Sequence, residues 1–193
     1  VDAVVVENLK DAPFDKAAPR ETVAMMAVVV DRLAQKAHVP IGVNVLRNDG
    51  LAAMAVAAAT GASFIRVNVF AGVAFTDQGI IEGHARDLLR LRRNLGTKTR
   101  ILVDVHVKHA AHLTSLEEAA IDAARNGPDA LIVSGIGTGR RTDPEHLQRV
   151  RNAVDLGFIV GTVLKTDGQI EGAIDVERVR ALAEAVASFR PSG

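Results

Sequence analysis

The sequence predicts an α/β fold, and within that class it favours a TIM-type (βα)8 barrel. Six apolar strand-like segments alternate with helical segments at the spacing of βα units. The strands carry aliphatic side chains at every second position, and several carry polar side chains in between. These polar residues lie near the carboxyl ends of their strands, where α/β folds bind ligands. A doubly wound sheet is the alternative, but helices cover both of its faces and leave no lumen for an inward polar face.

Length and composition are those of one domain, spanning residues 1–193. Hydrophobic residues make up 48% of the chain, which is enough for a sizeable core. The 23 Lys and Arg residues balance the 23 Asp and Glu residues, so the basic surface of a nucleic-acid-binding protein is not expected. No apolar run has the length of a membrane-spanning segment. The absence of cysteine fits a cytoplasmic protein.

Strands are expected where Val and Ile alternate with other residues. In order, they are residues 1–8, 41–47, 64–70, 100–109, 130–134 and 158–164. The second strand follows Pro40, which cannot continue a helix. In a parallel sheet covered by helices, polar groups turned inward are expensive unless they are paired or used.

Helical segments follow the strands and have recognisable ends. The first covers residues 20–37, with Glu21 in the first turn, where the helix dipole favours an acid. The second is rich in alanine, begins after Asn48 or Asp49 and stops at Gly61.

Residues 71–79 are expected to form a loop long enough to cover a site. A capping box of Ser115 with Glu118 begins a later helix. Asp143 and Pro144 begin another, with aspartate as the cap and proline at the first helical position. One more helix is expected after the last strand.

The candidate catalytic residues lie on the strand 100–109. Asp104, His106 and Lys108 alternate with valines and therefore share one face of an extended strand. Lys108 is nearest the mouth and is expected to transfer a proton, form an imine or steady an oxyanion. His106 would orient it, and Glu7 on the first strand is a second acid. The alternative is a static ion-pair network that only fills the lumen.

Neighbouring strands supply polar residues suited to substrate binding. Asn44, Arg66 and Asn68 are expected to point into the same lumen, one strand spacing away from the acid and the lysine.

Two glycine-containing segments are candidate phosphate sites. Residues Gly135, Gly137, Thr138 and Gly139 follow a strand and precede a helix, so their backbone amides could cradle a phosphate. Gly161 and Thr162 lie on the last strand, and barrels often bind phosphate at their final strands. The glycine-rich segment also suits a simple tight turn, and it is not a P-loop, because no Gly-Lys-Ser/Thr follows.

No metal site is expected. His106 and His109 would face apart on a strand, and His112 already lies in the following loop. The residues indicate no particular cofactor.

Several motifs together are distinctive. They are Val-Val-Val-Glu-Asn (4–8) with Asp-Ala-Pro-Phe (11–14), Gly-Val-Asn-Val-Leu-Arg-Asn-Asp (42–49), Phe-Ile-Arg-Val-Asn-Val (64–69), Thr-Asp-Gln-Gly-Ile-Ile-Glu-Gly (76–83), Val-Lys-His-Ala (107–110) and Gly-Phe-Ile-Val-Gly-Thr (157–162) with Lys165. In these motifs the chain resembles the BtpA family, which is named for a photosystem I biogenesis factor. The resemblance implies a TIM-type barrel related to phosphate-binding barrels, and it does not supply an established reaction.

Two departures from the family pattern concern the number of strands. The family's first strand does not precede Val1, and its seventh strand is missing between Val154 and Gly157. The six strands would then be strands two to six and eight. Because eight strands are needed to close such a barrel, a break in the chain is expected within Val154 to Phe158.

The leading functional hypothesis is an enzyme-like barrel, similar to a lyase or an isomerase. It would bind a small phosphorylated metabolite, a sugar phosphate or a nucleotide, and use acid–base or Schiff-base chemistry. The alternative, which the family name suggests, is a non-catalytic assembly or stability factor for photosystem I. The expected partner is a small phosphorylated ligand, with neither nucleic acid nor an integral membrane segment. The sequence leaves open whether the protein is a homo-oligomer.

Overall fold

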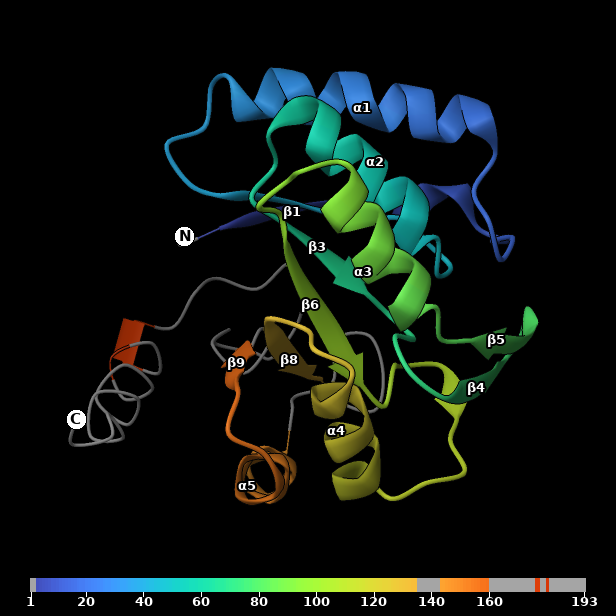
Figure 1. Cartoon of the computed structure of the whole chain (residues 1–193), viewed down its shortest axis with the longest axis vertical. Helices are drawn as coiled ribbons and strands as arrows, with labels where there is room; N and C mark the ends of the chain where they lie inside the picture. The colour runs from blue at the N-terminus through green and yellow to red at the C-terminus, as the bar shows by residue number, and fades with distance from the viewer. Residues whose placement is uncertain (1–2, 135–142, 160–175, 178–179, 181–193) are drawn as a thin grey trace.

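A computed structural model describes residues 3–134, 143–159, 176–177 and 180. Its main sheet contains six strands: β1 (Val4–Glu7), β2 (Ile41–Asn44), β3 (Phe64–Val67), β6 (Arg100–Val105), β8 (Ala130–Val133) and β9 (Gly157–Ile159). The helices are α1 (Arg20–Ala34), α2 (Gly50–Thr60), α3 (Ala85–Asn94), α4 (Leu116–Arg125) and α5 (Pro144–Ala153), with a 3-10 turn at Leu9–Asp11. The expected α/β class and the parallel sheet are confirmed (Figure 1).

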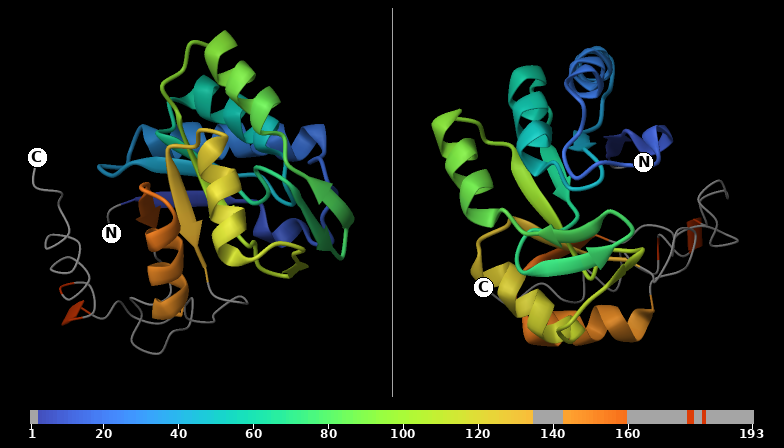
Figure 2. Two further views of the ribbon diagram at one scale, coloured as in Figure 1. Left: turned by 60° about the horizontal axis from the view of Figure 1, so that its bottom comes forward. Right: turned by 90° about the vertical axis from the view of Figure 1, so that its right-hand side faces the viewer.

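The strands follow one another in the sheet in the same order as in the sequence, β1-β2-β3-β6-β8-β9, and every neighbouring pair is parallel. A doubly wound sheet would reverse its strand order at a switch point. All five helices contribute to a single buried cluster with one face of the sheet, and Figures 1 and 2 show them around its outer side. This singly wound arrangement is that of a TIM-type barrel, with β1 and β9 as the outer strands of the described sheet.

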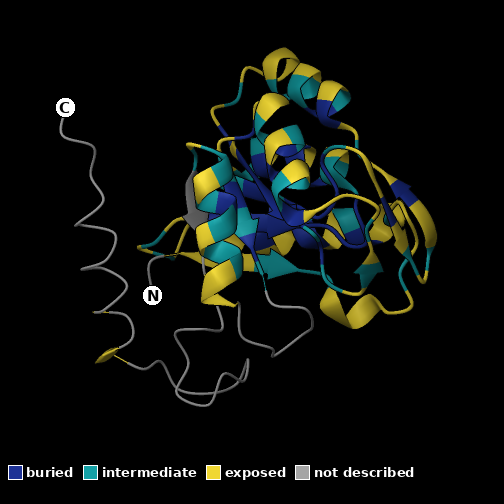
Figure 3. Cartoon of the chain, turned by 90° about the horizontal axis from the view of Figure 1, so that it is seen from below, coloured by how far each residue is buried: buried dark blue, intermediate teal, exposed yellow. Residues whose placement is uncertain are grey.

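Strand alternation places the aliphatic residues under the helices, as the sequence predicts. Val43, Val67, Val103 and Val105 are buried and pack with helix residues in the main core. Figure 3 shows buried residues on the strands and on the inner faces of the helices, with exposed residues on the outer faces. The other face of the sheet is therefore free to carry polar side chains.

The predicted caps of α2, α4 and α5 are confirmed, whereas α1 ends at Ala34, three residues before the predicted end. The Asp49 side chain accepts a hydrogen bond from the Ala52 N–H at the start of α2, and Gly61 ends this helix at a φ of 73°. The capping box begins α4, and Pro144 occupies the first turn of α5.

The prediction of a loop at residues 71–79 is wrong. Strands β4 (Val73–Thr76) and β5 (Gly79–Glu82) form an antiparallel hairpin there, and β4 also pairs with the short strand β7 (Ala110–Ala111). Ala74 and Ile81 pair across this hairpin and are buried in one cluster with Val69 and Val107, which stabilises the hairpin. The segment after β3 therefore forms a small three-stranded sheet, in the order β5-β4-β7, in addition to the main sheet.

The strand that carries the candidate acid and lysine is shorter than expected. It ends at Val105, because His106 adopts a φ of 56° and His109 a φ of 58°. Extended alternation stops where the backbone enters this left-handed region. The position of Lys108 is therefore set by a loop.

The predicted break within Val154 to Phe158 is also wrong. The peptide continues from α5 through Val154, Asp155 and Leu156 into β9, which pairs directly with β8. A three-residue helix-to-strand connection lies within the usual range. The rest of the expected last strand and most of the last helix fall outside the described residues.

Candidate functional site

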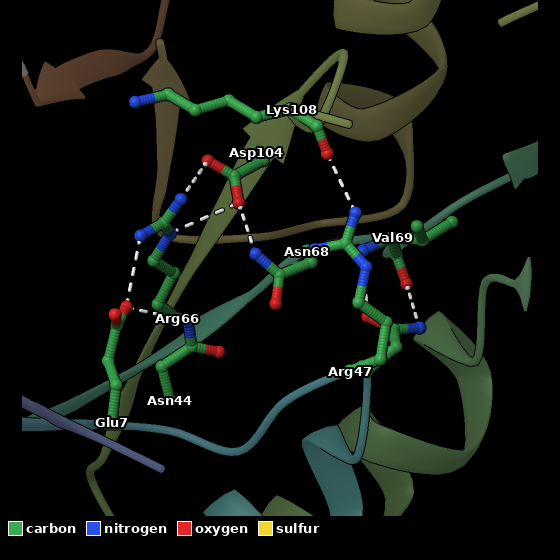
Figure 4. Close-up of polar contacts among 9 residues, drawn as sticks. Glu7, Asn44, Arg47, Arg66, Asn68, Val69, Asp104 and Lys108 are labelled. Atoms are coloured by element: carbon green, nitrogen blue, oxygen red, sulfur yellow. Dashed lines mark hydrogen bonds and ion pairs between the residues drawn. The ribbon is translucent and has the colours of Figure 1, made fainter. Parts of the chain in front are cut away.

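Five polar residues predicted to share the lumen do form one hydrogen-bonded network on the inner face of the sheet (Figure 4). The Asn44 amide donates to Glu7 Oε1 over 2.8 Å, and Arg66 Nη1 donates to the same oxygen over 3.1 Å. Arg66 also donates to Asp104, and so does the Asn68 amide over 2.7 Å. The network crosses β1, β2, β3 and β6 at or near their carboxyl ends.

Asp104 is the buried centre of this network. Its side chain has no exposed surface, and it accepts two hydrogen bonds of 3.1 Å from Arg66 Nε and Nη2. Burial raises the pKa of the Asp104 carboxyl, while Arg66 and Asn68 act in the opposite direction. Both carboxylate oxygens are engaged, so this group suits a fixed electrostatic role better than that of a free base.

Arg66 links the two acids. Burial alone would lower the pKa of its guanidinium, but the carboxylates of Asp104 and Glu7 raise it. The side chains of Arg66 and Glu7 are each about one quarter exposed, so this end of the network reaches solvent.

Lys108 lies above this network, although it has left the strand. Figure 4 shows its side chain running past Asp104 on the side of Arg66 and Glu7. In the part of the chain that the structure describes, its amine forms neither an ion pair nor a hydrogen bond. Burial, followed by the charge of Arg66, lowers the pKa of the Lys108 amine. A lysine in this state is suited to proton transfer or to attack on a carbonyl.

His106 does not join this group, so its predicted contact with Lys108 is wrong. The left-handed backbone at His106 turns the ring toward His112, on which it stacks with centroids 4.3 Å apart and planes at 11°. Both histidines line a cavity of about 200 Å³ with α4 residues and the loop after β3. His106 Nε2 is buried and has no hydrogen-bond partner among the residues that the structure describes, and burial, followed by His112, lowers the pKa of the ring.

Arg47 is a residue of the site that the sequence analysis did not single out. It follows β2 by three positions, is 8% exposed, and donates from Nη2 to the Lys108 carbonyl over 2.7 Å. The neighbouring Asn48 exchanges two hydrogen bonds with the backbone of Val69 and so fastens the loop after β3. The strand expected over residues 41–47 includes Arg47, but strict alternation would place Arg47 on the aliphatic face with Val43 and Val45, whereas the strand ends at Asn44.

The predicted phosphate residues Gly135, Gly137, Thr138, Gly139, Gly161 and Thr162 all lie outside the described residues. Ser134, which precedes the first segment, has a buried hydroxyl that has no hydrogen-bond partner within the described ranges. No group of three metal-ligating side chains occurs in the described ranges, and no helix there is long and apolar enough to cross a membrane.

The fold and the site together define a TIM-type α/β barrel protein that carries a buried ionic network and a half-buried lysine at the carboxyl ends of its strands. The chain belongs to the BtpA family, whose profile matches residues 1–156. It is 42% identical over 213 residues to the photosystem I biogenesis protein BtpA of Synechocystis, covering 97% of this chain and 74% of that protein. It is 45% identical over 213 residues to a protein of Thermococcus kodakarensis, covering 99% of this chain and 82% of the relative.

The alignment with the Thermococcus protein also bears on the number of strands. It extends over 213 residues, whereas this chain has 193, so the relative contains residues within the aligned region that have no counterpart here. The family profile ends at residue 156, inside the segment where the sequence indicates a missing strand. That a seventh strand is missing there remains a prediction.

Among solved structures, FabK from Thermotoga maritima, a TIM-barrel protein, is similar with a TM-score of 0.52 and 17% sequence identity. The match covers 83% of this chain and 44% of FabK. At this level of identity the similarity shows the fold alone.

Proposed function

We propose that this protein binds a small phosphorylated metabolite, a sugar phosphate or a nucleotide, at the carboxyl ends of its strands, and that Lys108 performs acid–base or Schiff-base chemistry there. The observation that carries the proposal is the Lys108 amine, which has no partner among the described residues and lies above a paired acid in a polar lumen. In a purely structural network a half-buried lysine within the electrostatic influence of Asp104 and Glu7 would be expected to pair with one of them.

The division of roles follows from the contacts. Lys108 is the reactive group. Asp104 and Arg66 form a fixed pair that sets the electrostatic field beneath it, and Glu7, one quarter exposed, is the acid that solvent and ligand can reach. Asn44 and Asn68 orient the two carboxylates. The His106 ring stacks on His112, and the cavity that both rings line also borders Asn68 and Asp104, so we propose for His106 a contact with a ligand in this cavity rather than a proton relay to Lys108.

The proposed phosphate contacts are the backbone amides of residues 135–139 and 161–162. Supporting this, β8 ends immediately before the first of these segments and on the same edge of the sheet as Asp104. Carboxyl ends of parallel barrel strands are the usual place for such a contact.

A thermal-shift screen of phosphorylated metabolites tests the proposal. A ligand present at 100 times its dissociation constant stabilises the folded state by about 2.7 kcal/mol. Wild type should be stabilised by at least one such metabolite. A Schiff base with a ligand that has a carbonyl group should be trapped by borohydride on Lys108, as mass spectrometry of the digest would show.

Lys98 is a matched control, because it is exposed and precedes β6 at the opposite end of the strand. Lys108→Ala should abolish trapping, while Lys98→Ala should leave it unchanged. Stabilisation by no phosphorylated metabolite would favour the alternative of a non-catalytic assembly factor, which the name of the Synechocystis relative suggests. Relatives in archaea and in Caenorhabditis elegans, which lack photosynthesis, argue for a role that is not confined to photosystem I.

A further inference from the structure

Arg47 is a buried cation at the mouth of the barrel that uses little of its hydrogen-bonding capacity. A guanidinium has five N–H donors. Arg47 is 8% exposed, yet the only hydrogen bond that its guanidinium forms in the described chain runs from Nη2 to the carbonyl of Lys108. It forms no ion pair with any carboxylate of the described residues, in contrast to Arg66.

The unused donors are not sealed off. Nε and Nη1 of Arg47 keep some exposure to solvent, unlike Asn68 Oδ1 and His106 Nε2, which are fully buried and have no partner among the described residues. Figure 4 shows Nη2 of the guanidinium directed at the carbonyl of Lys108. A molecule in the mouth could therefore reach the free N–H groups.

The positive charge of Arg47 is only partly balanced by nearby carboxylates. The acids that act on it are Asp77, at the tip of the hairpin, and Asp104, which is already engaged by Arg66 and Asn68. Burial lowers the pKa of the Arg47 guanidinium, which reflects the cost of removing this cation from water. A buried cation is ordinarily paired, and a planar guanidinium fits carboxylate and phosphate oxygens especially well.

We propose that Arg47 is an anion-binding group of the mouth, and that its free N–H groups take a carboxylate or phosphoryl oxygen of the bound ligand. This deepens the proposed function and rests on it. The ligand would present one anionic group on the β2 side of the lumen, next to the backbone of the loop that holds the reactive amine. Binding there would also fix that loop, because the same guanidinium already holds the Lys108 carbonyl.

The competing explanation is that Arg47 only fastens the loop after β6. That role needs Nη2 and predicts no response of Nε to small anions. The two explanations can be separated with the full chain by following arginine side-chain Nε–H signals in nuclear magnetic resonance spectra. The Arg47 signal is assigned by its loss in Arg47→Lys.

The probes are inorganic phosphate and malonate, titrated separately at constant ionic strength. We expect the Arg47 Nε–H signal to move saturably at millimolar concentrations of at least one probe. Response to phosphate alone would identify a phosphoryl subsite, and response to malonate alone a carboxylate subsite. Arg92, which pairs with Asp129 and is remote from the mouth, is the control and should not shift saturably. An Arg47 signal that stays in place with both anions would overturn the inference.

A variant provides the second measurement. Arg47→Met should weaken the affinity of the responding anion about tenfold or more, as expected for a charge-assisted hydrogen bond, while Arg92→Met should leave it unchanged. If Arg47→Met does not fold, Arg47→Lys, which keeps the charge without the planar fork, should weaken the same binding. Unchanged affinity in the folded variant would contradict the inference.

The failure of this inference and that of the proposed function are distinguishable. If phosphorylated metabolites stabilise wild type and Arg47→Met equally, the inference is wrong and the proposed function stands. If Arg47 responds to an anion but no metabolite stabilises the protein, the anion site stands and the proposed function does not.

Discussion

Arg66 on β3 holds Asp104 on β6 through two parallel hydrogen bonds, each 3.1 Å long. This bidentate geometry joins two neighbouring strands on the inner face of the sheet. The Asp104 side chain is fully buried, so the pair differs from the partly exposed ion pairs on the helices. The stability of the sheet and the chemistry of the candidate site therefore depend on the same contact.

Arg66→Met should destabilise the protein by about 3–5 kcal/mol, because it leaves a buried carboxylate without its charged partner. Urea unfolding followed by circular dichroism measures the change. The double variant Arg66→Met/Asp104→Leu should recover much of the loss, since neither charge is then buried alone. Arg92→Met, which breaks a partly exposed pair, should cost no more than about 1 kcal/mol. Equal costs for the two single variants would contradict this assignment.

The Lys108 amine should lose its proton at a lower pH than an exposed lysine. Burial and then the charge of Arg66 disfavour the ammonium form and lower the pKa, although Asp104 and Glu7 oppose them. Carbon-13 spectra of labelled lysine side chains give the titration midpoint, and Lys108→Met assigns the signal. A midpoint at or above the ordinary lysine value would show that the amine is ion-paired in solution.

The Glu117 carboxyl should titrate near pH 2. The hydrogen bond from Arg149 is the largest contribution that lowers its pKa to about 2. Because the folded pKa lies below the unfolded one, the pair stabilises the protein above the unfolded pKa of about 4.3, and this contribution is lost as the pH falls through about 2. The effect on unfolding should be small, since solvent screens an exposed pair. In Arg149→Ala the midpoint should rise toward the ordinary glutamate value, and an unchanged midpoint would refute the assignment.

Gly83 should not tolerate a side chain, because the backbone approaches it closely at the base of the β4–β5 hairpin. A Cβ there would collide with the carbonyl group of Phe70 and come within 2.6 Å of Ala71 Cα. Gly83→Ala should therefore destabilise the protein by about 1–3 kcal/mol. Gly50 is the matched control, since a Cβ at this helical position meets only ordinary contacts of 3.5 Å or more. Gly50→Ala should be neutral or stabilising by up to about 1 kcal/mol.

Strand alternation predicted the inner and outer faces of the sheet correctly for pairs such as Val43 with Asn44 and Val103 with Asp104. That prediction succeeds because a buried, extended strand has a fixed period of two and only one apolar face. The helix caps were equally predictable, because the cap at Asp49 and the C-terminal Gly61 depend on local chemistry alone.

The parts of the site that the sequence did not predict all involve backbone that leaves regular structure. Alternation placed His106 beside Lys108, but a φ of 56° directs the histidine to His112. The hairpin at Val73–Glu82 was missed because its strands are short and are stabilised by pairing with a distant segment, Ala110–Ala111. Arg47 was missed because its contact, the Lys108 carbonyl, lies 61 residues away and offers no side-chain signal.

The contact between Arg66 and Asp104 also controls how the chain aligns its strands. β3 pairs with β6 so that Val67 lies opposite Val103 and both face the helices. A slip of one residue would turn the Asp104 carboxylate into the aliphatic layer and a valine into the lumen, which reverses every side chain of the strand. The candidate site therefore also favours the correct register of β3 and β6 during folding, because a pairing shifted by one residue would leave the Asp104 charge without Arg66. Asp104→Val would remove a buried charge and, with it, the penalty that excludes misaligned sheets.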